Sequence, residues 1–497
     1  MRAFRLFLVL AILCTAHGYI TSYMPQHKQI AWLKKMTVDI CETSPGALTN
    51  EMLETTTLIM SGWKSTCTRN GKESALALES LLKRVIDERR AGNPQAIATT
   101  SDYNCMLEGW ASSGAGVAAA ERCERILVEM QDQYQKDGDA HVQPNLDSFK
   151  AVLLAWRQQA GQEDYAPHRA QRILEWMVRL YKDGQNDLVV PDTACFEIVL
   201  QSWSRSNHKD APQYTEALLV SMERLHKATG LETLRPSTAC YNAVLSAWAK
   251  SSKEGAPDRA MSVLEFMESC AGVEPDMVSY STVVGALART NDPEDARKAE
   301  QLLKHVEVGY RAGNTNLEVD TILYNCVIGC LAKSNANGSY RRARAVLDRQ
   351  IQLNENGCEQ CRPDVYSFTS VIGACAMETK ERSKAFRVAV ATFQQLRHNE
   401  EYATPNHVTY GSMLKCCARL LPSADPLRRK WVRKIFNMAV NNGCVGDMVL
   451  SRLREAATPD VYKELMNGVD RHDLPYEWTR NVQEKRVARK KRRRAEV

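Results

Sequence analysis

Two short motifs in the chain carry side chains that could bind a metal ion. His305 and Glu307 form a His-x-Glu motif, and Cys358 and Cys361 form a Cys-x-x-Cys motif. A zinc deaminase site uses both motifs, with a proline directly before the first cysteine. Here Gly357 stands in the place of that proline, and a structural zinc site needs about four ligands. We therefore predict no metal, no cofactor and no enzymatic activity.

An internal repeat supplies the elements that must position any functional side chain. Aromatic anchors recur in eight units, at intervals of 39 to 47 residues. Two apolar residues follow each anchor at the third and fourth positions, and tryptophan follows at the seventh position in the first four units. This spacing predicts one buried stripe of an α-helix. The anchors are Tyr103, Phe149, Phe196, Tyr241, Tyr280, Tyr324, Phe368 and Tyr410.

Each unit also contains signals for the start of a helix and for a second helix. Proline followed by a capping residue precedes most anchors, as at Pro363, and is typical of a helix N-terminus. A second apolar stripe follows, as at Ala170, Leu174 and Met177. Each unit is therefore predicted to be a helical hairpin, and stacked hairpins would share one core beside an open concave surface. Trp63 marks a degenerate earlier unit.

Two segments resemble a known family. Residues 241–250, YNAVLSAWAK, and residues 363–372, PDVYSFTSVI, closely resemble the pentatricopeptide repeat, and the resemblance covers roughly residues 55 to 455. The family repeat is about 35 residues, so every unit here is longer. Tetratricopeptide and HEAT repeats are alternatives whose motifs fit less well. The resemblance implies an all-α fold, a right-handed superhelical α-solenoid of stacked helical hairpins.

The resemblance also implies a set of residues that contact RNA. Such repeats bind about one base each, through a pair formed by the residue after the anchor and the last residue of the repeat, with an apolar wedge two residues before the anchor. The implied pairs are Asn104 with Asn145, Asn242 with Asp276, Ser281 with Asp320, Asn325 with Asp364, and Thr369 with Asn406. The wedges are Val278, Ile322, Tyr366 and Val408. The first pair would favour a pyrimidine, and the other four would favour U, G, U and A.

Two units depart from the family pattern, and helix capping is an alternative role for part of every pair. Lys150 with Asp192 and Glu197 with Ser237 match no familiar pair, and Glu197 would repel a nearby phosphate. Asp, Asn and Ser before a helix are favoured as caps in any protein. Capping, however, makes no demand on the residue after the anchor, such as Asn325.

The first residues have the layout of a targeting leader. Arg2 and Arg5 precede an apolar run over residues 6–14, which is typical of a signal peptide and too short for a membrane span. Residues 28–35 carry three lysines, and no acidic residue occurs before Asp39. This pattern favours a two-part leader for import into a plastid. Secretion and a mitochondrial leader remain alternatives, and the mature chain is not expected to cross a membrane.

The net positive charge of the chain comes from its last residues. Residues 484–497 hold eight basic and two acidic residues, so the remaining 483 residues carry 57 charges of each sign. RNA binding would therefore need local segregation of basic side chains. We expect a leader over 1–38, a cap with a degenerate repeat over 39–99, eight hairpins over 100–440, a helical cap over 441–483 and a basic disordered tail over 484–497.

The sequence thus supports two hypotheses on function. The first is a monomeric protein that binds single-stranded RNA selectively and acts in organellar RNA metabolism, together with protein factors. The second is a helical-repeat scaffold that binds proteins and makes no direct RNA contact, which the neutral body of the chain favours. Salt separates the two, because phosphate contacts weaken steeply as the salt concentration rises.

Overall fold

The computed structural model describes residues 26–482, apart from 271, 315, 335, 400, 401 and 472, and every regular element in that part is helical. The chain forms two compact units, residues 1–247 and 248–497. The expectations for residues 1–25 and for the basic tail lie outside the described residues. No helix in the described part is both long and apolar enough to cross a bilayer.

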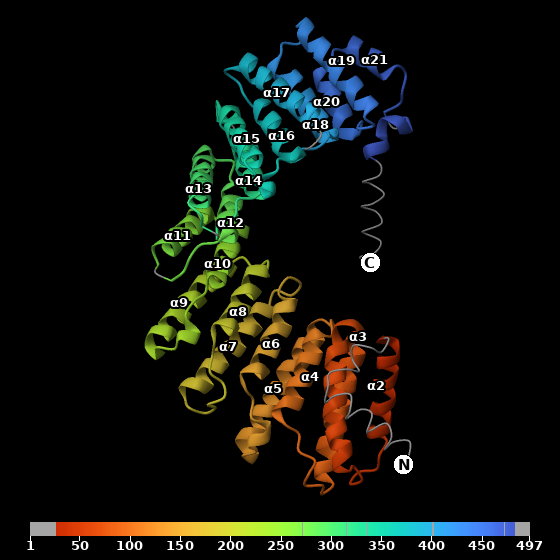
Figure 1. Ribbon diagram of the computed structural model, residues 1–497, viewed down its shortest axis with the longest axis vertical. Helices are drawn as coiled ribbons and strands as arrows, with labels where there is room; N and C mark the ends of the chain where they lie inside the picture. Colours follow the sequence, from red (N-terminus) through yellow and green to blue (C-terminus); the bar gives the residue numbers. More distant parts are fainter. Residues whose placement is uncertain are drawn as a thin grey trace. The chain divides into compact units, whose positions relative to one another are not determined.

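The first unit is a series of helices in which anchor helices alternate with second helices (Figure 1). The anchor helices carry the aromatic anchors, and the second helices pack against them. The bounds are α2 (Gln26–Cys41), α3 (Asn50–Arg90), α4 (Thr100–Ser112), α5 (Val117–Asp137), α6 (Leu146–Gln159), α7 (Ala166–Lys182), α8 (Thr193–Arg205) and α9 (Ala211–Thr229). Short 3-10 turns, η1 (Ala140–Val142) and η2 (Glu232–Leu234), precede α6 and α10 (Thr238–Lys250).

The second unit continues the same alternation (Figure 1). The boundary between the units falls inside the anchor helix α10. The bounds are α11 (Ala256–Ser269), α12 (Met277–Leu287), α13 (Pro293–Arg311), α14 (Thr321–Lys333), α15 (Ser339–Glu355), η3 (Glu359–Cys361), α16 (Val365–Cys375), α17 (Arg382–His398), α18 (His407–Leu420), α19 (Pro426–Asn441), α20 (Asp447–Ala456) and α21 (Pro459–Met466). The predicted all-α stack of helical hairpins is confirmed.

The core of both units is built from the predicted stripe. All eight anchors are at most 3% exposed, and the apolar residues three and four positions after them are buried as well. In the first unit, tryptophan side chains also link neighbouring hairpins. The indole of Trp156 donates to Glu124 Oε2 on the preceding second helix at 3.1 Å, and Trp203 donates to Gln171 Oε1 at 2.9 Å. The tryptophans thus fill the core and fix the spacing of the hairpins.

Part of the segment assigned to the leader packs against the first hairpin. Residues 26–38, assigned to the leader, form most of α2, whose Leu33 and Met36 are buried. Trp63 of α3 donates its indole N–H to Thr37 Oγ1 at 2.8 Å. Because α2 has an apolar face, the degenerate first hairpin can bury its own stripe against it. The basic, acid-free composition of residues 28–35 therefore does not prevent them from forming a packed helix.

The degenerate first hairpin, marked by Trp63, has both of its helices within α3. The backbone breaks at Gly71, where φ is 51° and ψ is −127°. A Cβ at this position would lie 2.8 Å from the carbonyl oxygen of Ser113. Glycine is needed for both reasons, because other residues rarely adopt a positive φ and because no side chain fits. Gly71 thereby turns one continuous segment into a hairpin.

Candidate nucleic-acid interface

The second residue of each predicted pair caps the next anchor helix. Asn145, Asp192, Asp276, Asp320, Asp364 and Asn406 are the N-caps of α6, α8, α12, α14, α16 and α18. Each of these side chains accepts a hydrogen bond from a backbone N–H in the first helical turn. Ser237 does the same for Cys240 N at 3.3 Å. The capping alternative is therefore correct, and it is compatible with a second role.

Two predicted pairs are joined directly, one in each unit. Asn104 donates from Nδ2 to Asn145 Oδ1 at 3.0 Å, and Asn325 donates from Nδ2 to Asp364 Oδ1 at 3.1 Å. In each case the third residue of the following helix, Ser148 or Ser367, donates its hydroxyl to the asparagine Oδ1 at 2.6 Å. The same three-residue network thus forms in both units.

A threonine at the start of the anchor helix holds each network in place. Thr321 Oγ1 lies 2.9 Å from the carbonyl oxygen of Gln360 and 2.6 Å from that of Arg362, in and just after η3. Thr100 and Thr193 bond in the same way to the segments at η1 and η2. Because η3 leads into α16, these bonds fix the distance between Asn325 and Asp364. This threonine was not among the residues predicted from the sequence, although its position three residues before the anchor recurs.

Two of the remaining pairs are not directly bonded in the structure. Ser281 donates to the carbonyl oxygen of Val278 at 3.3 Å, while Asp320 caps α14. Thr369 is buried and lies 2.8 Å from the hydroxyl of Thr409, which in turn donates to Asn406 at 3.2 Å. Thr369 and Asn406 are therefore linked through a third side chain.

The remaining predicted pair, Asn242 with Asp276, divides between the two units. Asn242 belongs to the first unit and is half-buried. Asp276 belongs to the second unit, where it caps α12.

Three of the four predicted wedges project into solvent. Val278 is 56% exposed, Ile322 is 65% exposed and Tyr366 is 54% exposed, whereas Val408 is half-buried. Each lies on the first turn of an anchor helix, one turn before the residue that follows the anchor. Since exposed large apolar side chains cost free energy unless something covers them, their recurrence marks a surface suited to a flat apolar partner.

In the first unit, charged residues of both departing pairs have protein partners. Lys150 Nζ lies 2.6 Å from Asp192 Oδ2, and Glu197 accepts a hydrogen bond from Gln201 at 2.8 Å. Burial alone would raise the pKa of Asp192, but the hydrogen bonds from Lys150 and Cys195 outweigh it and lower the pKa below its ordinary value. Lys64 and Glu108 form a further ion pair on neighbouring anchor helices at 2.5 Å. Lys150 with Asp192 and Lys64 with Glu108 thus neutralise each other pairwise.

Exposed basic side chains recur nine residues after the anchors, on or just after the anchor helices, and they were not predicted from the sequence; Arg205 is one of them in the first unit. Lys250, Arg289, Lys333 and Arg419 all lie nine residues after an anchor, and all four are exposed. The signal was available in that spacing, because the ninth position lies on the same helical face as the wedge and the pair residue. The segregation of charge that RNA binding requires is therefore present locally.

The deaminase-like motifs have structural partners. Glu307 Oε1 accepts a hydrogen bond from the hydroxyl of Tyr324 at 2.7 Å and from Arg349 at 3.1 Å. His305 is exposed and stacks near Tyr280 with ring centroids 5.8 Å apart. Among the described residues, no three His, Cys, Asp or Glu side chains are grouped so that they could hold a metal ion. The carboxylate of Glu307 therefore serves packing between hairpins.

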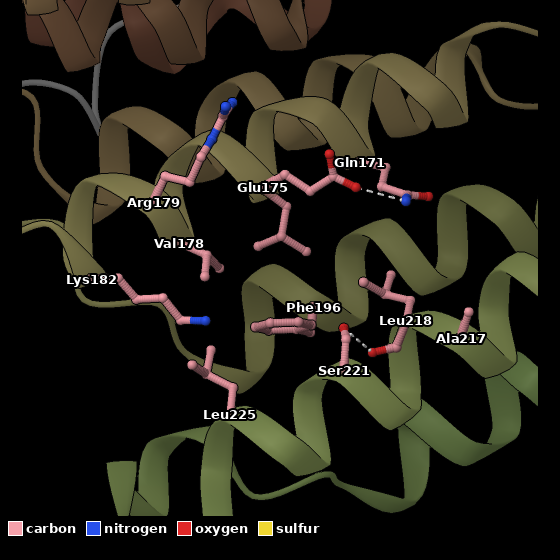
Figure 2. Close-up of a pocket in the computed structure, with 11 residues that line it drawn as sticks. Gln171, Glu175, Val178, Arg179, Lys182, Phe196, Ala217, Leu218, Ser221 and Leu225 are labelled. Atoms are coloured by element: carbon pink, nitrogen blue, oxygen red, sulfur yellow. Dashed lines mark hydrogen bonds between the residues drawn. The ribbon is translucent and has the colours of Figure 1, made fainter. Parts of the chain in front are cut away.

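A cavity of about 500 Å³ opens on the second-helix side of the first unit (Figure 2). It lies between α7 and α9 over the anchor Phe196, with Val178 and Leu218 on its walls and Arg179 and Lys182 at its edge. Its lining includes none of the predicted pair or wedge residues. The cavity is thus separate from the anchor-helix face.

Comparisons with known proteins give one kind of match. No family model matches the chain, and no curated protein matches it. A crystal structure of the pentatricopeptide repeat protein PPR10 from maize aligns with a TM-score of 0.45 and 18% identity. The chain is similar to a pentatricopeptide repeat structure. The alignment covers 95% of this chain and 59% of PPR10, so the chain spans less than two thirds of that protein. PPR10 in complex with an 18-nt psaJ RNA element aligns with a TM-score of 0.38 and 19% identity over 92% of this chain and 57% of that one.

Proposed function

We propose that the chain is a non-enzymatic protein that binds single-stranded RNA selectively through the anchor-helix face of its second unit. The observation that carries the proposal is the joined pair Asn325–Asp364 beside the exposed wedges Ile322 and Tyr366. A flat base needs an apolar surface for its face and polar groups for its edge. Both requirements are met here within two neighbouring hairpins.

The hydrogen-bonding groups of the pair are complementary to uracil. One Nδ2 hydrogen of Asn325 is used by Asp364 Oδ1, so the second can be donated. Asp364 Oδ2 has no hydrogen-bond partner among the described residues and can accept. The Watson-Crick edge of uracil places an N–H donor between two carbonyl acceptors. An adjacent donor and acceptor on the protein therefore match that edge.

The wedges would hold successive bases. Ile322 and Tyr366 occupy equivalent positions on the neighbouring helices α14 and α16. A base placed between two such side chains would lose apolar surface to both, and stacking on an aromatic ring contributes about 1–3 kcal/mol per base. We assign the bases G, U and A to the second-unit pairs that begin with Ser281, Asn325 and Thr369, and the U expected for Asn242 stays a prediction from the sequence. The contact at Thr369 is the weakest, because this residue is buried and bonded to Thr409.

The exposed basic residues would contact phosphates. Lys333 has no ion pair with any described residue and lies on α14 at the end opposite to Ile322. Phosphate contacts supply affinity that does not depend on sequence, whereas base contacts supply selectivity. A strand that follows the anchor helices of the second unit would meet both kinds of group. This arrangement explains how a chain with a neutral body can bind a polyanion.

Selection from a random RNA pool tests the proposal most directly. The purified chain should enrich a U-G-U-A-like core, and Ser281→Asn should shift its second base from G toward U. The matched control is Asp147→Asn, which changes an exposed anchor-helix residue of the first unit and should leave the selected sequence unchanged. A pool that shows no enrichment would favour the protein-binding scaffold, whose interactions should also be insensitive to salt.

The setting of this activity is part of the same proposal. We propose action in organellar RNA metabolism, by stabilisation, processing or translation of a transcript, with a plastid favoured over a mitochondrion or the secretory pathway. The support is the basic and apolar composition of residues 1–38. Fluorescence microscopy of the chain fused at its carboxyl end to a reporter checks the compartment. A monomer is expected, and light scattering measures it.

A further inference from the structure

Two cysteines lie in contact at the turn that leads into α16. The Sγ atoms of Cys358 and Cys361 are 2.8 Å apart, at the two ends of the turn that contains η3. Both thiols are directed at the carbonyl oxygen of Val319, at 3.8 Å from Cys358 and 3.1 Å from Cys361. Cys361 is fully buried, whereas Cys358 is half-buried. One thiol of the pair is therefore accessible from solvent and the other is not.

Other hairpins show that the fold does not require cysteine at either position. Cys361 lies two residues before Pro363. The residues two positions before Pro191 and Pro236 are Val189 and Leu234, and both are buried. Cys358 lies three residues before Cys361, and the equivalent residue three positions before Val189 is Asn186. Its side-chain amide donates to the carbonyl oxygen of Pro144 at 2.9 Å. An apolar residue and an amide thus do the same structural work. The two contacting thiols add a chemical property that packing does not explain.

We propose that Cys358 and Cys361 form a redox-active dithiol that closes reversibly to a disulfide by exchange with a small-molecule disulfide such as oxidised glutathione. The Cys358 thiolate attacks one sulfur of the small disulfide, whose S–S bond breaks and releases one thiolate. Cys361 then attacks Cys358 Sγ, and the second small molecule leaves as a thiol that takes up the Cys361 proton. The net products are one protein disulfide and two small thiols, and excess small thiol reverses the reaction.

The geometry sets the order of the two steps. A disulfide joins residues whose Cα atoms are about 4.4–6.8 Å apart, which residues three positions apart in a tight turn satisfy. Cys358 reacts first because the small disulfide can reach it. Burial raises the pKa of the Cys361 thiol, so this residue stays protonated until the mixed disulfide forms beside it. The proposal does not depend on RNA binding.

The test uses the full chain in buffers of defined ratios of reduced to oxidised glutathione. After acid quenching and alkylation, mass spectrometry of the peptides should show Cys358 and Cys361 losing alkylation together and gaining one intrachain disulfide. Cys361→Val should instead accumulate glutathione on Cys358, because the second thiol is absent, and valine at this position is compatible with the fold in the hairpin of Val189.

Two further variants complete the design. Cys358→Asn, which copies Asn186 of the earlier hairpin, should leave Cys361 reduced in the same buffers, because Cys361 is buried. The control Cys326→Ala removes a cysteine of α14 and should leave disulfide formation unchanged. The proposal is overturned when both thiols of the wild type remain alkylated in oxidised glutathione. It is equally overturned when glutathione accumulates on Cys358 to the same extent in the wild type and in Cys361→Val.

Discussion

The two units share one fold but differ in the chemistry of their anchor-helix faces. In the first unit, the wedge positions hold the small or acidic residues Ser101, Asp147 and Ala194. The charges that follow them are paired, as in Lys150 with Asp192. In the second unit the same positions hold exposed apolar side chains, such as Ile322. Burial of the stripe fixes the hairpin, whereas the solvent-facing positions are free to vary.

This difference indicates that the repeat alone does not make the proposed binding surface. Trp156 and Trp203 fill the core of the first unit, and their indoles donate hydrogen bonds to the preceding hairpin. These positions of the first unit therefore serve packing. The second unit has Leu287 and Leu331 at the same positions and carries the exposed wedges. Under the proposed function, the first unit is therefore a support and the second is the contact surface.

Glu88→Gln is expected to have the largest effect, and it acts on the stability of the first unit. The Glu88 carboxylate is fully buried and accepts hydrogen bonds from Arg84 at 2.6 Å and from the backbone N–H groups of Gly46 and Leu48, both at 2.9 Å. Its loss leaves Arg84 buried without a counter-charge, which costs roughly 3 kcal/mol. Urea unfolding measures the change, with the exposed Asp132→Asn as control. An unfolding free energy equal to that of the control would contradict the expectation.

The same carboxylate predicts a dependence on pH. Burial alone would raise the pKa of Glu88, but the hydrogen bonds from Arg84, Leu48 and Gly46 outweigh it and lower the pKa to about 2. A lowered pKa in the folded state stabilises the fold above the ordinary value and loses that stabilisation as pH falls toward 2. Wild-type stability should therefore decline from about pH 4.5 to 2 more steeply than that of Glu88→Gln. Parallel declines in thermal unfolding would refute this.

Tyr366→Ala tests the contrast between the two faces. Removal of the ring should weaken RNA binding by about 1–3 kcal/mol, because one base loses its stacking surface. Asp147→Ala makes the equivalent change in the first unit and should alter affinity by less than about twofold. Fluorescence anisotropy with the selected RNA measures both variants. Equal losses would show that the two faces contribute alike and would end the comparison.

Thr321→Val and Thr193→Val remove the same pair of hydrogen bonds in the two units. Each should lower the unfolding free energy by about 1–2 kcal/mol, since each bond contributes about 0.5–1.5 kcal/mol. Only Thr321→Val should also weaken RNA binding, because Thr321 positions Asp364. A loss of affinity in Thr193→Val, with Thr321→Val unchanged, would reverse the assignment of the two units.

The smallest expected effect is a gain in stability. Tyr324 donates its hydroxyl to Glu307, which lies 17 residues earlier in the chain. Gln350 lies 18 residues before Phe368, and its buried amide has no hydrogen-bond partner among the described residues. Phe368→Tyr should supply one and raise the unfolding free energy by about 1 kcal/mol.

The first unit offers the matched case for this change. Phe149 and the buried Gln131 repeat the same spacing, and the amide of Gln131 also lacks a partner in the described part of the chain. Phe149→Tyr should therefore give a similar gain. Thermal unfolding of both variants measures it. A loss in both would mean that the tyrosine hydroxyl has no room beside the glutamine.

The sequence predicted the core well because burial imposes a strict period. The anchors and the apolar residues after them, such as Tyr324, Val327 and Ile328, all lie in the core. The boundary at residue 38 stays a prediction, because a basic composition is compatible both with a leader and with an amphipathic helix such as α2. Thr321 was missed because its partners are backbone carbonyls of the next hairpin, which no side-chain pattern reveals.

The double role of the cap residues has a consequence for how such a surface can evolve. Asp364 starts α16 and, because it is exposed, also presents a carboxylate oxygen to solvent. Only short side chains with an acceptor start a helix well. The position of Asp364 therefore accepts only a few residue types, whereas the position of Asn325 is under no such restriction. Changes in base preference should arise more readily by substitution after the anchor, and variants at the cap should carry a cost in folding.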